Sequence, residues 1–146
     1  MRLQASTDYA VRILQYLHAV EGQEGELQTA TDISNATGVT YPFFIKIANQ
    51  LKKKGLLDSV QGRHGGYILG KSGEEISLYD VIRAVEGEVE IHGCLRTPPT
   101  CSMGDPSGCS MHVFFRGMQD KLIAELSGKS IADLVVASSE LENRAS

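Results

Sequence analysis

The cysteines of this chain are confined to one stretch of the sequence. Cys94, Cys101 and Cys109 lie within sixteen residues that are rich in glycine and proline, and no other cysteine occurs among the 146 residues. Thiolates on a flexible loop bind soft metal ions and iron–sulfur clusters. Structural zinc sites usually contain cysteine pairs with about two to four residues between them, whereas six and seven residues separate the cysteines here. The wide spacing favours a cluster over a zinc ion, with redox-active thiols as a third interpretation.

Three thiolates leave a metal centre one donor short, and two histidines flank them. His112 follows Cys109 by three residues, so on a helix its imidazole would lie about one turn from that thiol. His92 precedes Cys94 by two residues and is the less favoured donor. His112 is therefore a candidate fourth ligand.

Amphipathic segments on both sides of the cysteine loop must hold it in place. Apolar residues recur at helical spacing in five segments of the chain. They predict helices over about residues 6–20, 29–37, 40–55, 77–86 and 111–127. A glycine-rich turn between two short apolar runs, 56–61 and 67–69, predicts a β-hairpin. Beyond Gly128, Ser130 is expected to cap a short turn around Leu134, and the last residues are expected to fray.

Side chains that can cap helices stand at several of the predicted helix starts. Ser6 or Thr7 is placed to cap the first helix, and Thr40 the third. Ser77 with Asp80 three residues later resembles a capping box. These signals support the predicted boundaries.

The second and third predicted helices, joined at Gly38, have the arrangement of a helix-turn-helix. Apolar residues on one side of the third helix would face the core, which leaves its opposite side to face DNA. The N-terminal residues of that side lie where base edges come within reach, and its lysines suit phosphates. The hairpin then forms a wing whose tip can enter a narrow minor groove. The residues expected to contact DNA are Thr40, Tyr41, Phe43, Lys46, Gln50, Lys53, Arg63 and His64.

Charge is divided unevenly along the chain. The net charge is −4, but residues 40–71 contain six Lys or Arg and one Asp, a local net charge of +5. The rest of the chain therefore carries −9. This asymmetry favours one basic surface that faces an anion such as DNA.

Taken in order, these features resemble the IscR/NsrR group of winged helix-turn-helix regulators. The matching stretches are MRLQASTDYAVRILQYL at the start, DISNATGV and IKIANQLKKKGLL in the reading helices, SVQGRHGGYILG in the wing, SLYDVIRAVEG, the cysteine loop and SIADLV. The resemblance covers about residues 1–136. It implies a homodimer on a palindromic operator, with the helix of residues 111–127 packed against its twofold mate.

The resemblance also implies an iron–sulfur cluster on the three cysteines, with a 4Fe–4S cluster favoured and a 2Fe–2S cluster as the alternative. Asp8 in STDYAVR matches the position from which NsrR-like members supply a carboxylate across the dimer. His112 matches the histidine of IscR-like members. The resemblance therefore implies two candidates for the fourth ligand, with Asp8 from the partner subunit favoured.

Two features of this chain depart from the family's pattern. Gln61 replaces the arginine of the usual S-x-R-G wing motif, so Arg63 is expected to take over its minor-groove contact. The gaps between the cysteines are also wider than is usual in the family. The wing and the cysteine loop are therefore the places where this chain differs from the usual family pattern.

The sequence predicts a mainly α fold with a small β-hairpin wing, a winged helix-turn-helix, plus a long dimerisation helix. Residues 1–72 would form the DNA-binding domain, 73–136 the cysteine loop and dimerisation helix, and 137–146 a flexible tail. No apolar run approaches the roughly 18 residues of a membrane span. The first residues do not read as a secretory signal, and the odd number of cysteines favours the reducing cytoplasm.

An enzyme is not expected, because the sequence contains no phosphate-binding loop, dinucleotide fingerprint or catalytic triad. The predicted function is a homodimeric DNA-binding transcription regulator. It is predicted to be a repressor that senses nitric oxide, redox stress or iron–sulfur status through its cluster. A cluster-free regulator controlled by thiol chemistry or a partner protein, and a zinc-stabilised DNA-binding module, are the alternatives.

Overall fold

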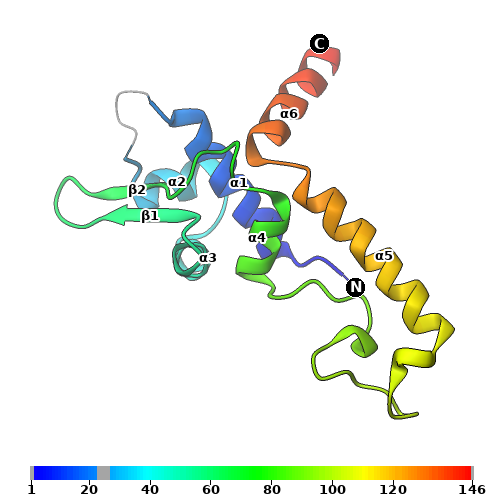
Figure 1. The fold of residues 1–146 in the computed structure, drawn as a ribbon. Coiled ribbons are helices and arrows are strands. Elements are labelled where there is room, and N and C mark those ends of the chain that lie inside the picture. Colours follow the sequence, from blue (N-terminus) through cyan, green and yellow to red (C-terminus); the bar gives the residue numbers. More distant parts are fainter. Residues whose placement is uncertain (1, 23–26, 146) are drawn as a thin grey trace.

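The computed structural model describes residues 2–22 and 27–145, without the side chains of residues 136–142. Its elements, shown in Figure 1, are α1 (Ala5–Val20), α2 (Ala30–Thr37), α3 (Tyr41–Lys53), β1 (Leu57–Val60), β2 (Gly66–Leu69), α4 (Leu78–Val85), α5 (Ser110–Ser127) and α6 (Ile131–Ala145), with two short 3-10 helices, η1 (Gly93–Leu95) and η2 (Pro106–Gly108). This is the mainly helical fold with one β-hairpin that the sequence predicts. None of the helices in this described part of the chain has the length and apolarity that crossing a membrane requires.

One apolar core holds α1, α2, α3, the hairpin and α4 together. The predicted core stripe of α3 is almost completely buried. It consists of Phe44, Ile47, Ala48 and Leu51, each at most 1% exposed. α1 supplies Ala10, Ile13, Leu14 and Leu17 to the same core. Burial of one large apolar side chain contributes about 1.5–3 kcal/mol, so this core fixes the position of α3.

A smaller apolar cluster attaches α5 to the rest of the fold through its C-terminal half. This cluster buries Ile82 of α4, Val89 of the segment after α4, and Leu126 of α5. Leu122 and Ile123 of α5 pack on these three residues. The N-terminal half of α5 extends away from the main core toward the cysteine loop (Figure 1). α5 therefore spans the distance between the helical core and that loop.

Capping boxes hold the starts of α2, α4 and α6, and the box at α6 is formed by Ser130 and Asp133. Ser77 and Asp80 form the box that the sequence predicts at the start of α4. Thr29 and Asp32 form a second box at the start of α2, which the sequence analysis did not identify. Each box satisfies backbone N–H groups that the helix itself leaves unpaired.

The start of α1 differs from the prediction. No side chain caps this helix, so the prediction that Ser6 or Thr7 does so is wrong. Instead, the carboxylate of Glu86, at the end of α4, accepts hydrogen bonds from the Gln4 N–H at 2.7 Å and the Thr7 hydroxyl at 2.5 Å. A long-range contact between α1 and α4 thus replaces a local cap.

The outer edge of β2 is held by a third extended segment, close to the turn of the hairpin. Ser59 of β1 lies opposite Tyr67 of β2, and Tyr67 also pairs with Gln28. The Tyr67 N–H donates to the Gln28 carbonyl at 2.7 Å, and the Gln28 N–H donates to the Tyr67 carbonyl at 3.1 Å. Gly66 permits this close approach, because a Cβ there would lie 2.7 Å from the Gln28 carbonyl oxygen. The wing is therefore attached to the segment that leads into α2.

The C-terminal segment is more regular than predicted. Ser130 caps its start as expected, since its Oγ accepts from the Asp133 N–H at 3.1 Å. However, α6 continues to Ala145, so the prediction of a short turn with frayed residues behind it is wrong about secondary structure. The flexibility of residues 137–146 and the boundaries of the three predicted domains stay predictions.

We expect Phe44→Ala to lower the free energy of unfolding by about 3–5 kcal/mol, because its ring is fully buried and its removal leaves a cavity. Phe43→Ala is the matched control, since the Phe43 side chain is 52% exposed and its loss should cost less than about 1 kcal/mol. Urea denaturation followed by circular dichroism at one protein concentration measures both. Equal losses for the two variants would contradict the assignment of the core face of α3.

Candidate nucleic-acid interface and cysteine loop

The outer face of α3 is the surface most suited to DNA. Gly38, the C-cap of α2, has a φ of 73° in the left-handed region. Thr40 stands at the N-cap position of α3 as predicted, but its side chain makes no capping hydrogen bond. Tyr41 and Phe43 stand in the first turn with 56% and 52% of their surface exposed, and Lys46 one turn later is exposed as well. Large exposed side chains at the start of the second helix match the end of a helix-turn-helix that reads the groove.

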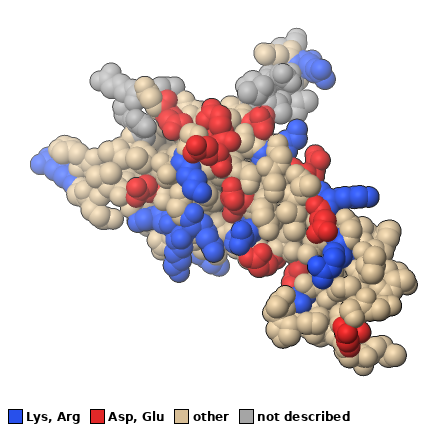
Figure 2. All heavy atoms as spheres, in the orientation of Figure 1, with Lys and Arg blue, Asp and Glu red and all other residues tan. Residues whose placement is uncertain are grey.

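Positive charge gathers on the same side of the molecule. Figure 2 shows Lys and Arg side chains over α3 and at the tip of the hairpin, while most Asp and Glu side chains lie away from them. Lys46, Lys53 and Lys54 are exposed, and within the described residues none of them forms an ion pair with a carboxylate. Unpaired exposed lysines suit the phosphates of a DNA backbone.

Gln50 is held inside the fold, unlike the other residues expected to contact DNA. Its side chain is half-buried, and its Nε2 donates to the carbonyl oxygen of Val85 in α4 at 3.4 Å. A flanking contact between Gln50 and DNA would break this bond, and that contact stays a prediction. In this structure Gln50 links α3, the reading helix of the predicted helix-turn-helix, to α4.

Lys52 makes a contact that the sequence analysis missed. Its Nζ donates to the Oγ of Ser59 on β1 at 2.6 Å, and it is only partly exposed, unlike Lys53 and Lys54. No sequence signal marks this pair, because the two residues lie on different elements and neither belongs to a motif. The contact ties α3 to the wing.

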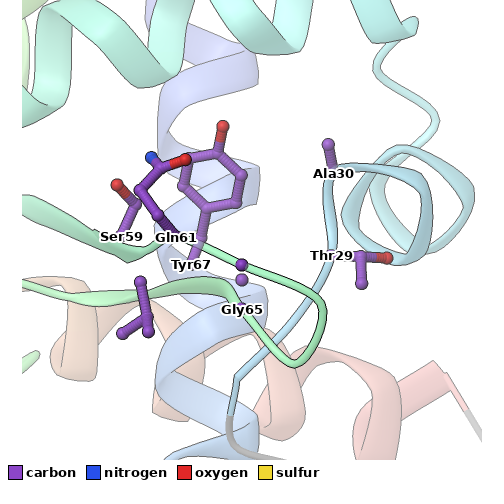
Figure 3. A pocket seen from close by; sticks show the side chains of 9 residues that line it. Thr29, Ala30, Ser59, Gln61, Gly65 and Tyr67 are labelled. Carbon is purple, nitrogen blue, oxygen red and sulfur yellow. The ribbon is translucent and has the colours of Figure 1, made fainter.

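The tip of the wing is open to solvent. Arg63 and His64 are exposed in the turn between β1 and β2. Gly65 lets this turn close, because a Cβ there would lie 2.0 Å from the Val60 carbonyl oxygen. Behind the turn, a hollow of about 200 Å³ separates the hairpin from the start of α2 (Figure 3). The two basic side chains therefore project where a DNA groove can reach them.

The N-terminus of α2, at the edge of this hollow, already carries a carboxylate. Asp32 Oδ2 accepts from the Thr29 hydroxyl at 2.8 Å and from the Thr29 N–H at 3.3 Å. Negative charge is favourable at a helix N-terminus, but it also repels a phosphate. This end of α2 is therefore not suited to the DNA backbone.

Asp8, the ligand expected from the partner subunit, lies on the exposed side of α1. Its carboxylate forms an ion pair with Arg12 at 2.7 Å. The guanidinium of Arg12 also lies 5.6 Å from the centre of the Tyr9 ring, and that ring meets Phe43 of α3 edge-to-face at 6.0 Å. Exposed ion pairs contribute less than about 1 kcal/mol, so Asp8 can exchange this partner for another.

The three cysteines differ in exposure. Cys94 lies in η1 and is 7% exposed, Cys101 is partly exposed, and Cys109 is exposed as the N-cap of α5. All three are free thiols. Within residues 2–22 and 27–145, no three or more His, Cys, Asp or Glu side chains form a group that could hold a metal ion. The structure therefore does not bring the predicted ligands together at one point.

His112 lies in a cavity of about 260 Å³ that Cys94 and Arg116 also line. The imidazole is 9% exposed, so it is a buried group and not a surface residue. Its Nε2 lies 3.4 Å from the Arg116 guanidinium, and its Nδ1 has no hydrogen-bond partner among the described residues. A buried nitrogen without a partner is unfavourable, so this side chain is suited to binding a ligand.

The other histidine of the loop is already engaged. His92 Nδ1 accepts from the Cys94 N–H at 3.3 Å, and its ring stacks on Phe115 at 5.1 Å between centroids. These contacts position Cys94 at the start of η1. That His92 is the less favoured donor stays a prediction.

A carboxylate stabilises the turn before Cys109. The Ser107 N–H and then its hydroxyl donate to Asp105, at 3.0 and 2.8 Å, which holds the pKa of this carboxyl below its usual range. A depressed pKa in the folded state contributes stability above the ordinary carboxyl pKa, and this contribution is lost as pH falls through the depressed value. The turn is therefore fully stabilised at neutral pH.

The chemistry of these donors fits a soft metal centre such as an iron–sulfur cluster. Thiolates are the ligands that such clusters use, and three free thiols share one loop with a buried imidazole. Residues 91–109 contain only one-turn 3-10 helices. The thiols can therefore approach one another through movement of the loop, without unfolding of α4 or α5.

The first half of α5 leaves an apolar face in water. Met111, Phe114 and Met118 share one side of the helix by their spacing, and they are between 47% and 61% exposed. Single chains rarely expose several large apolar side chains together unless another molecule covers them. This face is the one that the sequence analysis assigns to dimerisation.

A helix-turn-helix with an exposed basic second helix, followed by a wing with a basic tip, defines a DNA-binding transcription regulator of the winged helix-turn-helix class. The chain belongs to the Rrf2 family, described as "Iron-dependent Transcriptional regulator", whose pattern matches residues 3–137.

Known proteins agree with this assignment. The HTH-type transcriptional regulator IscR of Photorhabdus laumondii subsp. laumondii is 36% identical over 135 residues, which cover 92% of this chain and 79% of that protein. The structure of CymR, the global cysteine regulator of B. subtilis, matches with a TM-score of 0.73 at 20% identity, over 94% of this chain and 98% of CymR. T. potens IscR matches with a TM-score of 0.71 at 21% identity, over 97% of this chain and 90% of that chain.

These likenesses confirm three predictions: the winged helix-turn-helix fold, the resemblance to IscR-type regulators, and DNA-binding regulation as the general function. They also agree with the prediction that the chain is not an enzyme, because the similar proteins are transcription regulators. The individual DNA contacts and metal ligands stay predictions.

Because Lys46 is exposed and unpaired with a carboxylate in the described structure, we expect Lys46→Met to weaken DNA binding. The slope of log Kobs against log salt should fall by about 0.9 for each phosphate that the protein no longer neutralises. Lys129→Met, at an exposed position between α5 and α6, is the matched control and should leave the slope unchanged. Fluorescence anisotropy at several KCl concentrations, with a duplex selected from a random pool, measures both. If the two variants behaved alike, α3 would not face the phosphates.

Proposed function

We propose that this regulator is a cytoplasmic, homodimeric repressor that binds a palindromic operator and holds an iron–sulfur cluster on Cys94, Cys101 and Cys109. Its signal would be nitric oxide, redox stress or the iron–sulfur status of the cell. One observation carries the proposal: three free thiols lie on the loop that joins α4, which contacts the reading helix, to α5, which has the exposed apolar face. The family's description as iron-dependent and the relatives named IscR support it.

On DNA, the first turn of α3 would enter the major groove. Tyr41 and Phe43 would contact bases, and the lysines of α3 would bind phosphates on either side. Arg63 and His64 would enter the adjacent minor groove from the wing. The complete set proposed to contact DNA is Thr40, Tyr41, Phe43, Lys46, Gln50, Lys53, Arg63 and His64, with Gln50 giving up its bond to Val85.

A second copy of the chain would cover the exposed face of α5. Met111, Phe114 and Met118 are the largest apolar side chains left in water on this helix. Twofold packing of α5 against its mate would place the two α3 helices on successive major grooves, about 34–36 Å apart. A palindromic operator follows from that symmetry.

The cluster would be held by the three cysteines and one further donor, with 4Fe–4S favoured and 2Fe–2S as the alternative. We place His112 as the fourth ligand, because its ring is buried in the cavity that Cys94 lines and its Nδ1 has no partner among the described residues. The partner's Asp8, which the resemblance favours, is the competing candidate and would have to leave Arg12. When bound, such a cluster supplies a centre that reacts with nitric oxide and oxygen.

Regulation would act through the position of residues 91–109. Ligation would hold this loop in one conformation, and its release would allow α5 to shift relative to α4. α4 in turn contacts the reading helix through the Val85 carbonyl and Gln50. A 100-fold change in operator affinity requires only about 2.7 kcal/mol of difference between the two states.

The cluster is tested by anaerobic purification followed by visible spectroscopy and analysis of iron, sulfide and zinc. We expect brown protein with iron and sulfide, because three thiolates are available on one loop. Cys101→Ser should lose the colour, and Ser102→Ala, at an exposed position in the same loop, should keep it. Colourless protein with one zinc per chain would support the zinc-stabilised module. Metal-free protein that still responds to oxidants would support regulation by thiol chemistry.

The same preparation separates the two candidate fourth ligands. His112→Ala should lose iron on gel filtration faster than wild type, whereas Asp8→Ala should retain it. The opposite result would assign the role to the partner's Asp8. Rescue of the His112→Ala protein by added imidazole would identify a missing ligand and exclude general damage to the cavity.

The dimer is tested by placing a charge on the exposed face of α5. Phe114→Asp should convert the protein to a monomer, because a carboxylate buried between two apolar helices is strongly unfavourable. Ser127→Asp, at an exposed position at the other end of the same helix, should leave the dimer intact. Sedimentation equilibrium measures both masses. A wild-type protein of single-chain mass, or a Phe114→Asp dimer, would show that α5 is not the contact.

A further inference from the structure

We propose that Lys52 and Ser59 lock the angle between the wing and α3, and so determine where Arg63 and His64 meet DNA. Lys52 is then a positioning residue and not a phosphate contact, although it lies in a run of three lysines. The consequence for DNA rests on the proposed docking of α3 and the wing. The lock itself is a property of the free protein.

The first support is the contact between the two side chains. Lys52 Nζ lies 2.6 Å from Ser59 Oγ, across the junction between α3 and β1. Lys52 is partly buried, whereas Lys53 and Lys54 are exposed. Its ammonium is therefore already used inside the protein, while its two neighbours remain free to bind phosphates.

The second support is that this contact holds β1 farther along the hairpin than Leu57, which anchors the start of the strand in the core that contains α3. Ser59 lies directly opposite Tyr67 in the hairpin, and the Tyr67 ring meets Phe44 of α3 edge-to-face at 5.0 Å between centroids. Phe44 and Lys52 are eight residues apart, so the two attachments are separated by about 12 Å along the helix axis. The Lys52–Ser59 contact therefore restrains the outer part of β1 in addition to the ring contact on β2 and the buried Leu57.

Apolar packing holds the start of β1 through Leu57 but not its outer end, where Val60 is 49% exposed. On the side of α2, a hollow of about 200 Å³ lies between the hairpin and Thr29 and Ala30. Figure 3 shows Ser59 and Tyr67 together on one side of this hollow, with Thr29 and Ala30 across it. The backbone pairing with Gln28 also acts at Tyr67 of β2. That strand already contacts Phe44 through the same tyrosine. Without Lys52, β1 would keep no polar side-chain contact to α3 among the described residues.

The consequence for DNA follows from the length of the wing. Arg63 lies four residues beyond Ser59, so the tip projects roughly 10 Å past the lock. A rotation of about 10° at the base would move the tip by about 2 Å, which is enough to break a hydrogen bond to a base edge. The lock therefore affects which bases the wing prefers more than it affects the charge presented to the phosphates.

The lock is tested first in the free protein, by 15N relaxation of backbone amides. In Lys52→Met and Ser59→Ala, order parameters at Arg63 and Gly66 should fall from about 0.85 to below about 0.6. Ser59→Thr keeps the hydroxyl and should behave as wild type. Lys54→Met repeats the lysine change at an exposed neighbour and should leave the wing amides unchanged. Unaltered order parameters in both Lys52→Met and Ser59→Ala would overturn the proposal.

The effect on recognition is tested with two duplexes that differ only in the base pairs under the wing. The ratio of their affinities should fall about fivefold or more in Lys52→Met and in Ser59→Ala. The double variant should show no larger a fall than either single variant, because both changes remove the same hydrogen bond. Ser59→Ala should keep the wild-type salt dependence. If Lys52→Met lowered the salt slope while Ser59→Ala kept the affinity ratio, Lys52 would be a phosphate contact and the proposal would be wrong.

Arg63→Ala separates this result from a failure of the proposed docking. If that variant kept the wild-type ratio for the two duplexes, the wing would not read these bases, and the docking proposal would be wrong. The relaxation measurements on the free protein would still decide the lock. The lock is supported if Lys52→Met and Ser59→Ala lose order in the wing while Ser59→Thr keeps it. This holds whether or not the wing reads these bases.

Discussion

The burial of one side of α3 is the interaction on which the rest of the structure depends. Phe44, Ile47, Ala48 and Leu51 enter the core that α1 and α4 also build. Because a helix repeats every 3.6 residues, fixing these four side chains also fixes which residues face outward. Tyr41, Phe43, Lys46 and Lys53 are exposed as a consequence. The surface that can read DNA is thus determined by apolar packing on the opposite side of the same helix.

The end of α4 connects this helix to the remainder of the chain. The Val85 carbonyl accepts from Gln50 of α3, and the next residue, Glu86, accepts from the Gln4 N–H and the Thr7 hydroxyl at the start of α1. Glu86 is also the C-cap of α4, after which the chain continues toward the cysteine loop. In the proposed regulation, a displacement of that loop would reach α1 and α3 through these polar contacts and through the apolar packing of α4 in the shared core.

Several local features of this fold could be predicted from sequence, although the box of Thr29 and Asp32 was missed, and contacts between distant segments could not be predicted. The capping box of Ser77 and Asp80 involves residues three apart, so its pattern is visible in the sequence. The contact of Glu86 with Thr7 spans 79 residues, and the pair of Lys52 and Ser59 joins a helix to a strand. Neither pair belongs to a motif, and each forms only because the core sets the positions of its elements. For the same reason, spacing alone predicts the cysteines as ligands without fixing how they would approach one another.

α5 connects the cysteine loop both to the helical core and to the exposed apolar face. Its C-terminal half is anchored on Ile82 and Val89, its N-terminal half leaves Met111 and Phe114 exposed, and Cys109 is its N-cap. A helix of 18 residues is about 27 Å long and bends little. Its two ends therefore cannot move independently. In the proposed dimer, a change in the loop at one end would alter the angle at which the exposed face is presented to a second copy, and the anchored end would pass that change to α4.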